Sequence, residues 1–275
     1  MEYNMIRNWF LWTLCVWLAG TSVGFWQSPL DENFVTRDAF IRSRQKTPPT
    51  RQSKSRGRKK TPATPKQPLG LGYSIYSRNA FGRPERVKPD QTFQTGQAIR
   101  FVIESNQDGY LYIFNADSAG GLKMIYPNPY LQNGENEILA HVPYQVPSIK
   151  EPDPDNQWFY FLTEGPLREE LYFVVSRTPQ PGIPTGTQLI KYARKEHANA
   201  WSPSDQIWQR IELARQTPLR QSTIDDFGSP QTEGELLAVT REIGLKPQDT
   251  PPSAIFMNST AEAPLLVTRV QLVKR

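Results

Sequence analysis

A basic, proline-rich tract limits how much of this chain can fold. Residues 43–68 contain no aliphatic side chain except Ala63 and consist mainly of Ser, Thr, Gln, Pro, Lys and Arg. Such a stretch cannot bury enough apolar surface to offset the conformational entropy that folding removes. We therefore expect residues 25–68 to form a disordered basic linker, and one folded domain to occupy residues 69–275.

The positive net charge of +5 comes from this basic part of the chain, because residues 37–66 carry +10 and the rest of the chain is net negative. Residues 37–66 hold eleven lysines and arginines against one acid, Asp38, whereas residues 67–275 carry a net charge of −3. The folded part is therefore nearly neutral, which argues against a nucleic-acid-binding domain. No aromatic residue interrupts the basic cluster, so stacking on bases is not indicated either.

The densest part of the tract has two interpretations. As an arm, it would contact an anionic partner such as lipid headgroups or an acidic envelope polymer. As a spacer, it would only hold the domain away from a membrane. The residues that would make the anionic contacts are Lys54, Arg56, Arg58, Lys59 and Lys60.

The first residues have the pattern of an export signal. Arg7 precedes the uncharged run Trp9–Gly20, and small residues follow at 22–24. A basic start, an apolar stretch of ~7–15 residues and small residues before the cut are typical of secretory signal peptides. We expect a signal peptide over residues 1–24 and a periplasmic or secreted protein. An uncleaved anchor, with the domain on either side of the membrane, is the alternative.

Few residues are available for metal or covalent chemistry. The chain has one cysteine, Cys15, which excludes internal disulfides and multi-cysteine metal sites. We interpret one of the two histidines, His141, as structural or exposed. No Gly-x-Ser-x-Gly, His-Glu-x-x-His or phosphate-loop pattern occurs. We therefore expect no catalytic residue, no metal site and no cofactor, and a protein that is not an enzyme.

From residue 69 onward, short apolar or alternating runs are separated by polar turns. Ile99, Phe101 and Ile103 recur at every second position, the period of a strand with one buried face. Strands at intervals of ~8–12 residues indicate an all-β sandwich or barrel. The expected strands are Gly72–Ser77, Glu85–Lys88, Ala98–Ser105, Gly109–Asn115, Leu122–Tyr126, Asn136–His141, Trp158–Leu162, Glu170–Ser176 and Leu265–Leu272.

The fold class that these strands favour is mainly β. We expect an antiparallel, immunoglobulin-like β-sandwich with a short helical insertion at about residues 187–252. Within the insertion, Ile207, Ile211 and Ala214 follow one another at helical spacing. A second, weaker helical pattern covers Glu233–Ile243 and is followed by a glycine.

Several short blocks occur in a fixed order in this region. They are Gly72-Tyr73, Thr92-Phe93, Thr95-Gly96-Gln97, Asp108-Gly109-Tyr110-Leu111-Tyr112, Tyr126-Pro127-Asn128, Trp158-Phe159-Tyr160-Phe161 and Glu170-Leu171-Tyr172. Over about residues 73–179 they resemble a bacterial family known as domain of unknown function 4384. The strand near residues 265–273 is similar to the closing strand of that family. The resemblance implies an exported β-rich accessory domain, and it implies no catalytic residue because the family has no established activity.

Three tyrosines are the candidate ligand-binding residues. Tyr126, Tyr130 and Tyr144 fall near loops that contain prolines. Flat rings bind sugars and prolines well, so these residues would line a glycan or peptide groove. Packing of the rings within their loops is the alternative interpretation.

The sequence as a whole favours a non-catalytic, exported accessory or binding module that contacts a partner protein or an envelope polymer. Two other functions fit the same sequence. One is a cytoplasmic regulatory domain tethered to the membrane, with its basic linker on anionic lipid. The other is a hydrolase that uses two carboxylates ~5–9.5 Å apart in one cleft.

Overall fold

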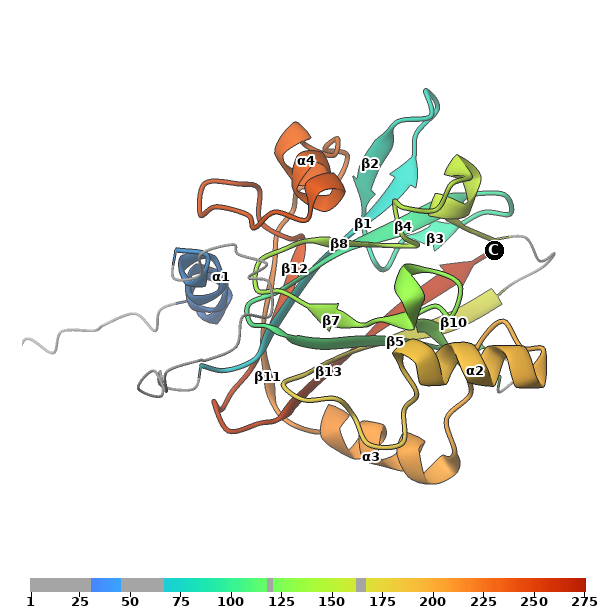
Figure 1. The fold of residues 1–275 in the computed structure, drawn as a ribbon. Helices are drawn as coiled ribbons and strands as arrows, with labels where there is room; N and C mark the ends of the chain where they lie inside the picture. The colour runs from blue at the N-terminus through green and yellow to red at the C-terminus, as the bar shows by residue number, and fades with distance from the viewer. Residues whose placement is uncertain (1–30, 46–66, 118–120, 162–166) are drawn as a thin grey trace, which may run out of the picture. The chain divides into compact units, whose positions relative to one another are not determined.

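The computed structural model describes residues 31–45, 67–117, 121–161 and 167–275 (Figure 1). In these residues it places thirteen strands in two sheets, together with four α-helices. The expectation of a mainly β chain is confirmed. In the same ranges, no helix is long and apolar enough to cross a membrane.

One sheet has seven strands. Five lie in the order β11-β12-β1-β4-β8, while β2 pairs with β1 and β9 pairs with β4. Their bounds are β1 (Gly70–Arg78), β2 (Pro84–Val87), β4 (Ala98–Ser105), β8 (Tyr144–Val146), β9 (Phe159–Tyr160), β11 (Leu219–Thr223) and β12 (Ala254–Asn258). The central strand β4 has the bounds that its alternating pattern predicts, and all of its residues are buried.

The second sheet has six strands. Five lie in the order β3-β13-β10-β5-β6, and β7 pairs with β5. Their bounds are β3 (Thr92–Phe93), β5 (Gly109–Asp117), β6 (Leu122–Tyr126), β7 (Glu137–Ile138), β10 (Leu167–Ser176) and β13 (Leu265–Lys274). The short strand β3 runs parallel to β13, so the expectation of an antiparallel sandwich is wrong for this one edge pair.

The two sheets pack face to face around one hydrophobic core. On β5, Leu111 points into this core, whereas Tyr112 points to the outer face of its sheet. Successive side chains of a strand face opposite sides, so β5 is buried on both faces. The rings of Tyr73 on β1 and Phe173 on β10 stack across the core with centroids 5.3 Å apart. The architecture is a β-sandwich.

Helices cover the outer face of the six-stranded sheet. Both α2 (Gly186–Glu196) and α3 (Asp205–Arg215) contribute buried residues to a second hydrophobic cluster on that face. The ring centroid of Trp208 on α3 lies 4.7 Å from that of Tyr172 on β10. Two short 3-10 helices lie elsewhere in the described ranges, η1 (Gln132–Gly134) and η2 (Pro154–Gln157).

The insertion expected at residues 187–252 is helical only in part. Besides α2 and α3 it contains α4 (Glu233–Arg241), which begins with a capping box between Thr232 and Glu235. It also contains β11, which pairs with β12 at the edge of the seven-stranded sheet. The expectation of a helical insertion is therefore wrong for residues 219–223, where a polar strand lacks the apolar alternation that marks the others.

A helix also lies in the range expected to be a disordered linker. It is α1 (Glu32–Ser43), and its N-cap Asp31 accepts a hydrogen bond from the backbone N–H of Asn33 at 3.0 Å. Phe40 is fully buried against residues of β12. The expectation of disorder is therefore wrong for residues 31–45, because one capped helix with one buried ring packs on the sandwich.

Several other expectations fall outside the described residues. The signal peptide over residues 1–24 lies there, as does most of the linker, residues 46–66. The five basic residues of the arm hypothesis belong to that second range: Lys54, Arg56, Arg58, Lys59 and Lys60. Both hypotheses stay predictions from the sequence.

Candidate functional site

Three adjoining hollows follow one edge of the sandwich, where β6 ends one sheet and β8 and β9 flank β4 in the other. The largest is a cavity of about 250 Å³. Its lining comes from both sheets and is mostly apolar: Ile99, Phe101, Asn115, Ile125, Phe159, Tyr160, Phe161, Glu169, Leu171 and Leu272.

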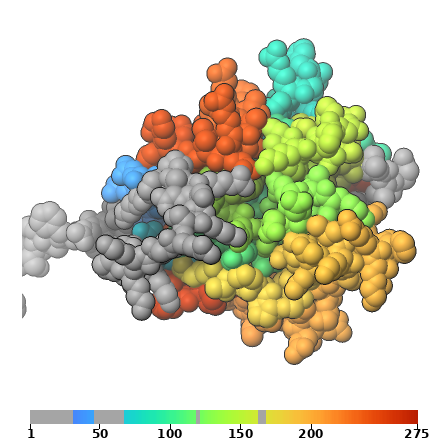
Figure 2. All heavy atoms as spheres, viewed as in Figure 1, coloured from blue at the N-terminus to red at the C-terminus, as the bar shows by residue number. Residues whose placement is uncertain are grey.

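The hollows share lining residues and therefore adjoin one another. The middle hollow, of about 50 Å³, shares Ile125 and Phe159 with the largest cavity. The third, of about 10 Å³, shares Tyr126, Gln132 and Ser148 with the middle one. We call the three together the edge groove. In Figure 2 the chain segment 121–161, coloured green to yellow-green, reaches the surface between α4 above and α2 below.

The structure brings two of the three predicted tyrosines together. Tyr126 and Tyr144 line the same hollow of the edge groove. Tyr126 is buried, which raises the pKa of its hydroxyl. The hydroxyl of Tyr144 accepts a hydrogen bond from the backbone N–H of Leu139 at 2.9 Å, which fixes the ring. Tyr130 is 64 % exposed and lies outside the lining of all three hollows.

The largest cavity has one polar end. Asn115 on β5 donates from Nδ2 to Oε2 of Glu169 on β10 at 3.3 Å. Burial raises the pKa of the Glu169 carboxyl, and the negative charge of Asp117 raises that pKa further, although the bond from Asn115 opposes them. Within the described ranges, no group of three or more His, Cys, Asp or Glu is placed to hold a metal ion.

A buried charge cluster holds α1 on the sandwich, and the sequence gives no local sign of it. Arg44, which follows α1, donates from Nε and Nη2 to the two carboxylate oxygens of Glu104 on β4, at 2.9 and 2.7 Å. Both side chains are almost completely buried. Arg44 Nη1 donates to the backbone oxygens of Lys246 and Asp249 as well, at 3.1 and 2.9 Å.

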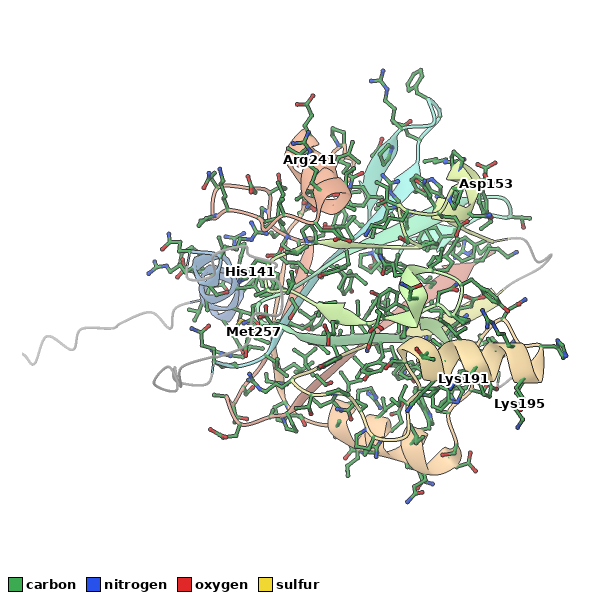
Figure 3. All side chains as sticks on the ribbon, in the orientation of Figure 1. His141, Asp153, Lys191, Lys195, Arg241 and Met257 are labelled. Atoms are coloured by element: carbon green, nitrogen blue, oxygen red, sulfur yellow. The ribbon has the colours of Figure 1, made fainter. Side chains whose placement is uncertain are left out.

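The same carboxylate contacts His141, which the structure buries. His141 Nδ1 lies 2.7 Å from Glu104 Oε1, and its Nε2 lies 2.9 Å from Ser43 Oγ at the end of α1. Burial raises the pKa of Glu104, but hydrogen bonds from His141 and Arg44 outweigh burial and bring the pKa below its ordinary value. Figure 3 shows His141 beside α1.

Ser43, His141 and Glu104 follow one another in the order of a nucleophilic triad. Ser43 Oγ has one proton, and it also lies 2.5 Å from the backbone oxygen of Phe40. A proton that Ser43 donates to Phe40 does not point at His141, so the histidine is not placed to abstract it. Ser43 is only 7 % exposed, and Arg44 already holds both oxygens of Glu104. These contacts favour a structural role in docking α1.

A second buried cluster holds α4 on the same sheet. Arg86 on β2 donates to Glu235 on α4 at 2.7 Å and pairs with Asp226. The Nε of Arg86 also donates to the hydroxyl of Tyr76 on β1 at 2.9 Å. The cluster joins side chains from four segments of the chain, so it too forms only when the protein folds. Its members are Tyr76, Arg86, Asp226 and Glu235.

Residues 92–179 match the family model of a domain of unknown function, DUF4384. The resemblance expected from the sequence is therefore confirmed over this range, which runs from β3 to just beyond β10. The matched range contains every residue that lines the largest cavity except Leu272. No curated protein and no solved structure matches the chain.

Proposed function

We propose that this protein is a non-catalytic, exported binding module with an immunoglobulin-like sandwich, and that it contacts a partner protein or an envelope polymer through the edge groove. The observation that carries the proposal is a row of three adjoining hollows along one sandwich edge, whose lining residues lie mostly inside the range that matches the family model. A site that belonged to the family's fold would lie in that range.

The chemistry of the groove suits a ligand with flat or apolar faces. Tyr126 and Tyr144 offer rings at one end, and Phe159 lies between the middle hollow and the largest cavity. Concave sites lined by apolar and aromatic side chains with a few polar groups are the usual form of ligand sites. A sugar ring or a proline of a peptide would stack on such rings.

Co-sedimentation with purified, insoluble peptidoglycan tests the polymer form of the proposal. Tyr144→Ala is expected to weaken binding about tenfold or more, because aromatic residues in a groove are common binding hot spots. The matched control is Tyr130→Ala, which removes an exposed tyrosine outside the groove. Circular dichroism must show both variants folded. Equal binding by the two folded variants would contradict a role for the groove.

Export and the basic arm need their own experiments. N-terminal sequencing of the natively produced protein is expected to give a start near Phe25 in the extracytoplasmic fraction. An intact N-terminus on a protease-protected domain would instead support the membrane-tethered cytoplasmic form. Changing the five arm residues to glutamine is expected to abolish salt-sensitive binding to anionic vesicles. Unchanged binding would favour the spacer interpretation.

A further inference from the structure

The largest hollow of the edge groove is big enough to hold a small organic molecule. Its volume is about 250 Å³. An engineered apolar cavity of ~150 Å³ already binds benzene. Most of its lining is apolar, with Phe101 and Phe159 among the larger side chains. The space therefore fits one aromatic ring or a short alkyl chain.

The polar end of this cavity offers one buried acceptor that lacks a donor and one carboxylate that can accept further hydrogen bonds. Asn115 lines the cavity, and its side-chain oxygen is buried without a hydrogen-bond partner among the described residues. Glu169 accepts only one hydrogen bond from a side chain there, the bond from Asn115. A buried acceptor without a donor costs free energy, so a ligand that donates to the Asn115 oxygen would remove that cost, and a second donor would reach the Glu169 carboxylate.

The charge at this end is negative. Asp117 on β5 lies opposite Glu169 in the register of β5 and β10, and its negative charge raises the pKa of the Glu169 carboxyl. Within the described ranges, Glu169 makes no ion pair with a lysine or an arginine. Lys123 lies opposite Asn115 on β6, but its side chain is exposed. A cationic head with N–H donors is the complement of this end of the cavity.

We propose that the cavity binds a small amphipathic amine, with an aromatic or short alkyl body between the sheets and an ammonium head against Glu169 and Asn115. This inference rests on the proposed function only in using the largest hollow of the same groove. A free carboxylic acid of the same size would place its charge beside two carboxylates and is excluded by repulsion. A hydrated metal ion would leave the apolar lining without a partner.

Isothermal titration of the full chain with hexylamine, hexanol and hexanoate at neutral pH tests the inference. Hexylamine is expected to bind most tightly, and hexanoate is expected not to bind. Glu169→Gln is expected to weaken hexylamine binding about tenfold, because hydrogen bonds to charged groups are the strong ones. The same variant should leave hexanol binding within about twofold of wild type.

Two further variants make the result specific. Glu170→Gln is the matched control, because Glu170 is the next carboxylate on β10 but pairs with Arg269 on the opposite face. It should bind hexylamine as wild type does. Ile125 is a partly buried residue of the cavity lining. Ile125→Trp fills part of the cavity with a bulky ring and should abolish binding of both hexylamine and hexanol. Thermal unfolding confirms that each variant folds.

Three results would overturn the inference. Equal affinity for hexylamine and hexanol in wild type would show that the polar end does not recognise a cation. No binding of either probe by the folded wild-type chain would show that the cavity takes no such molecule. Displacement of hexylamine by calcium ions at equal concentration would show that the carboxylates form a metal site instead. Each result is independent of peptidoglycan binding, so the proposed function stands or fails separately.

Discussion

Arg44 and Arg86 are both buried, and each fastens a helix to the seven-stranded sheet, but they do so from opposite sides of the contact. Arg44 is the C-cap residue of α1, and its side chain reaches into the sandwich to Glu104. Arg86 belongs to the sheet itself and receives Glu235 from α4 as well as Asp226. In both clusters, hydrogen-bonded ion pairs offset the free energy that the charged side chains lose when they are removed from water.

The position of the arginine determines which charged groups stay in the sheet when the helix detaches. If α1 detaches, it takes Arg44 with it, and Glu104 keeps the contact with His141 while gaining access to water. If α4 detaches, Arg86 stays in the sheet beside Tyr76. We infer that α1 opens as a separate unit, whereas the contacts of α4 are part of the global stability of the sandwich.

Removing Arg86 is expected to have the largest effect. Arg86→Met leaves Glu235 and Asp226 without their cation, and breaking a buried pair in this way costs about 3–5 kcal/mol. Urea denaturation followed by circular dichroism measures the free energy of unfolding. A loss below about 1 kcal/mol would mean that water already solvates these carboxylates. Asp155→Asn, which removes an exposed partner of Arg78, serves as the surface control.

Removing Arg44 is expected to cost less. Arg44→Met should lower the stability of the docked helix by about 2 kcal/mol, because the loss cannot exceed the free energy that holds α1 in place. The signature is local: amide hydrogen exchange should rise in α1 while β4 and β10 keep their protection. A global loss as large as that of Arg86→Met would show that α1 and the sandwich unfold together.

Acid is expected to release α1 before it unfolds the sandwich. The folded pKa of Glu104 lies below its ordinary value of 4.5, so its stabilising contribution is complete above that pH. As the pH falls through the lowered pKa, Glu104 becomes neutral and the attraction to Arg44 is lost. Hydrogen exchange in α1, corrected for the intrinsic effect of pH, measures the release.

The contribution of Glu169 to stability has the opposite dependence on pH. Its pKa is raised in the folded protein, so protonation favours folding there and cannot cause the release of α1. Glu104→Gln is therefore expected to remove the acid-dependent step, whereas Glu169→Gln should leave it in place. Release at the same pH in both variants would assign the step to another group.

The strands of the sandwich were predictable where their residues alternate. β4 and β6 have the bounds that the sequence predicts, because apolar side chains recur at the period of a strand. β11 was not predictable in this way, since its residues are polar and it lies among helices. It becomes a strand only because β12 offers a free edge, which is a tertiary effect.

The candidate sites were less predictable than the fold. Tyr126 and Tyr144 were identified by residue type, and the structure places them in one hollow. The charge clusters gave no signal, because Arg44 and Glu104 are 60 residues apart and Arg44 lies in a tract whose composition indicates disorder. No local spacing encodes a cavity whose lining comes from two sheets.

The smallest effect is expected for Ser43. Ser43→Ala removes one hydroxyl from the α1 cluster and should cost about 1 kcal/mol or less, because His141 keeps its contact with Glu104. Ser253→Ala is the matched change in the Arg86 cluster, where the hydroxyl contacts Asp226 at 3.0 Å. If the α1 cluster is only structural, neither change affects hydrolysis of an activated ester such as p-nitrophenyl acetate. Hydrolysis by wild type that Ser43→Ala abolishes and Ser253→Ala retains would instead make Ser43 a nucleophile, and the two arginine clusters would then differ in function as well as in stability.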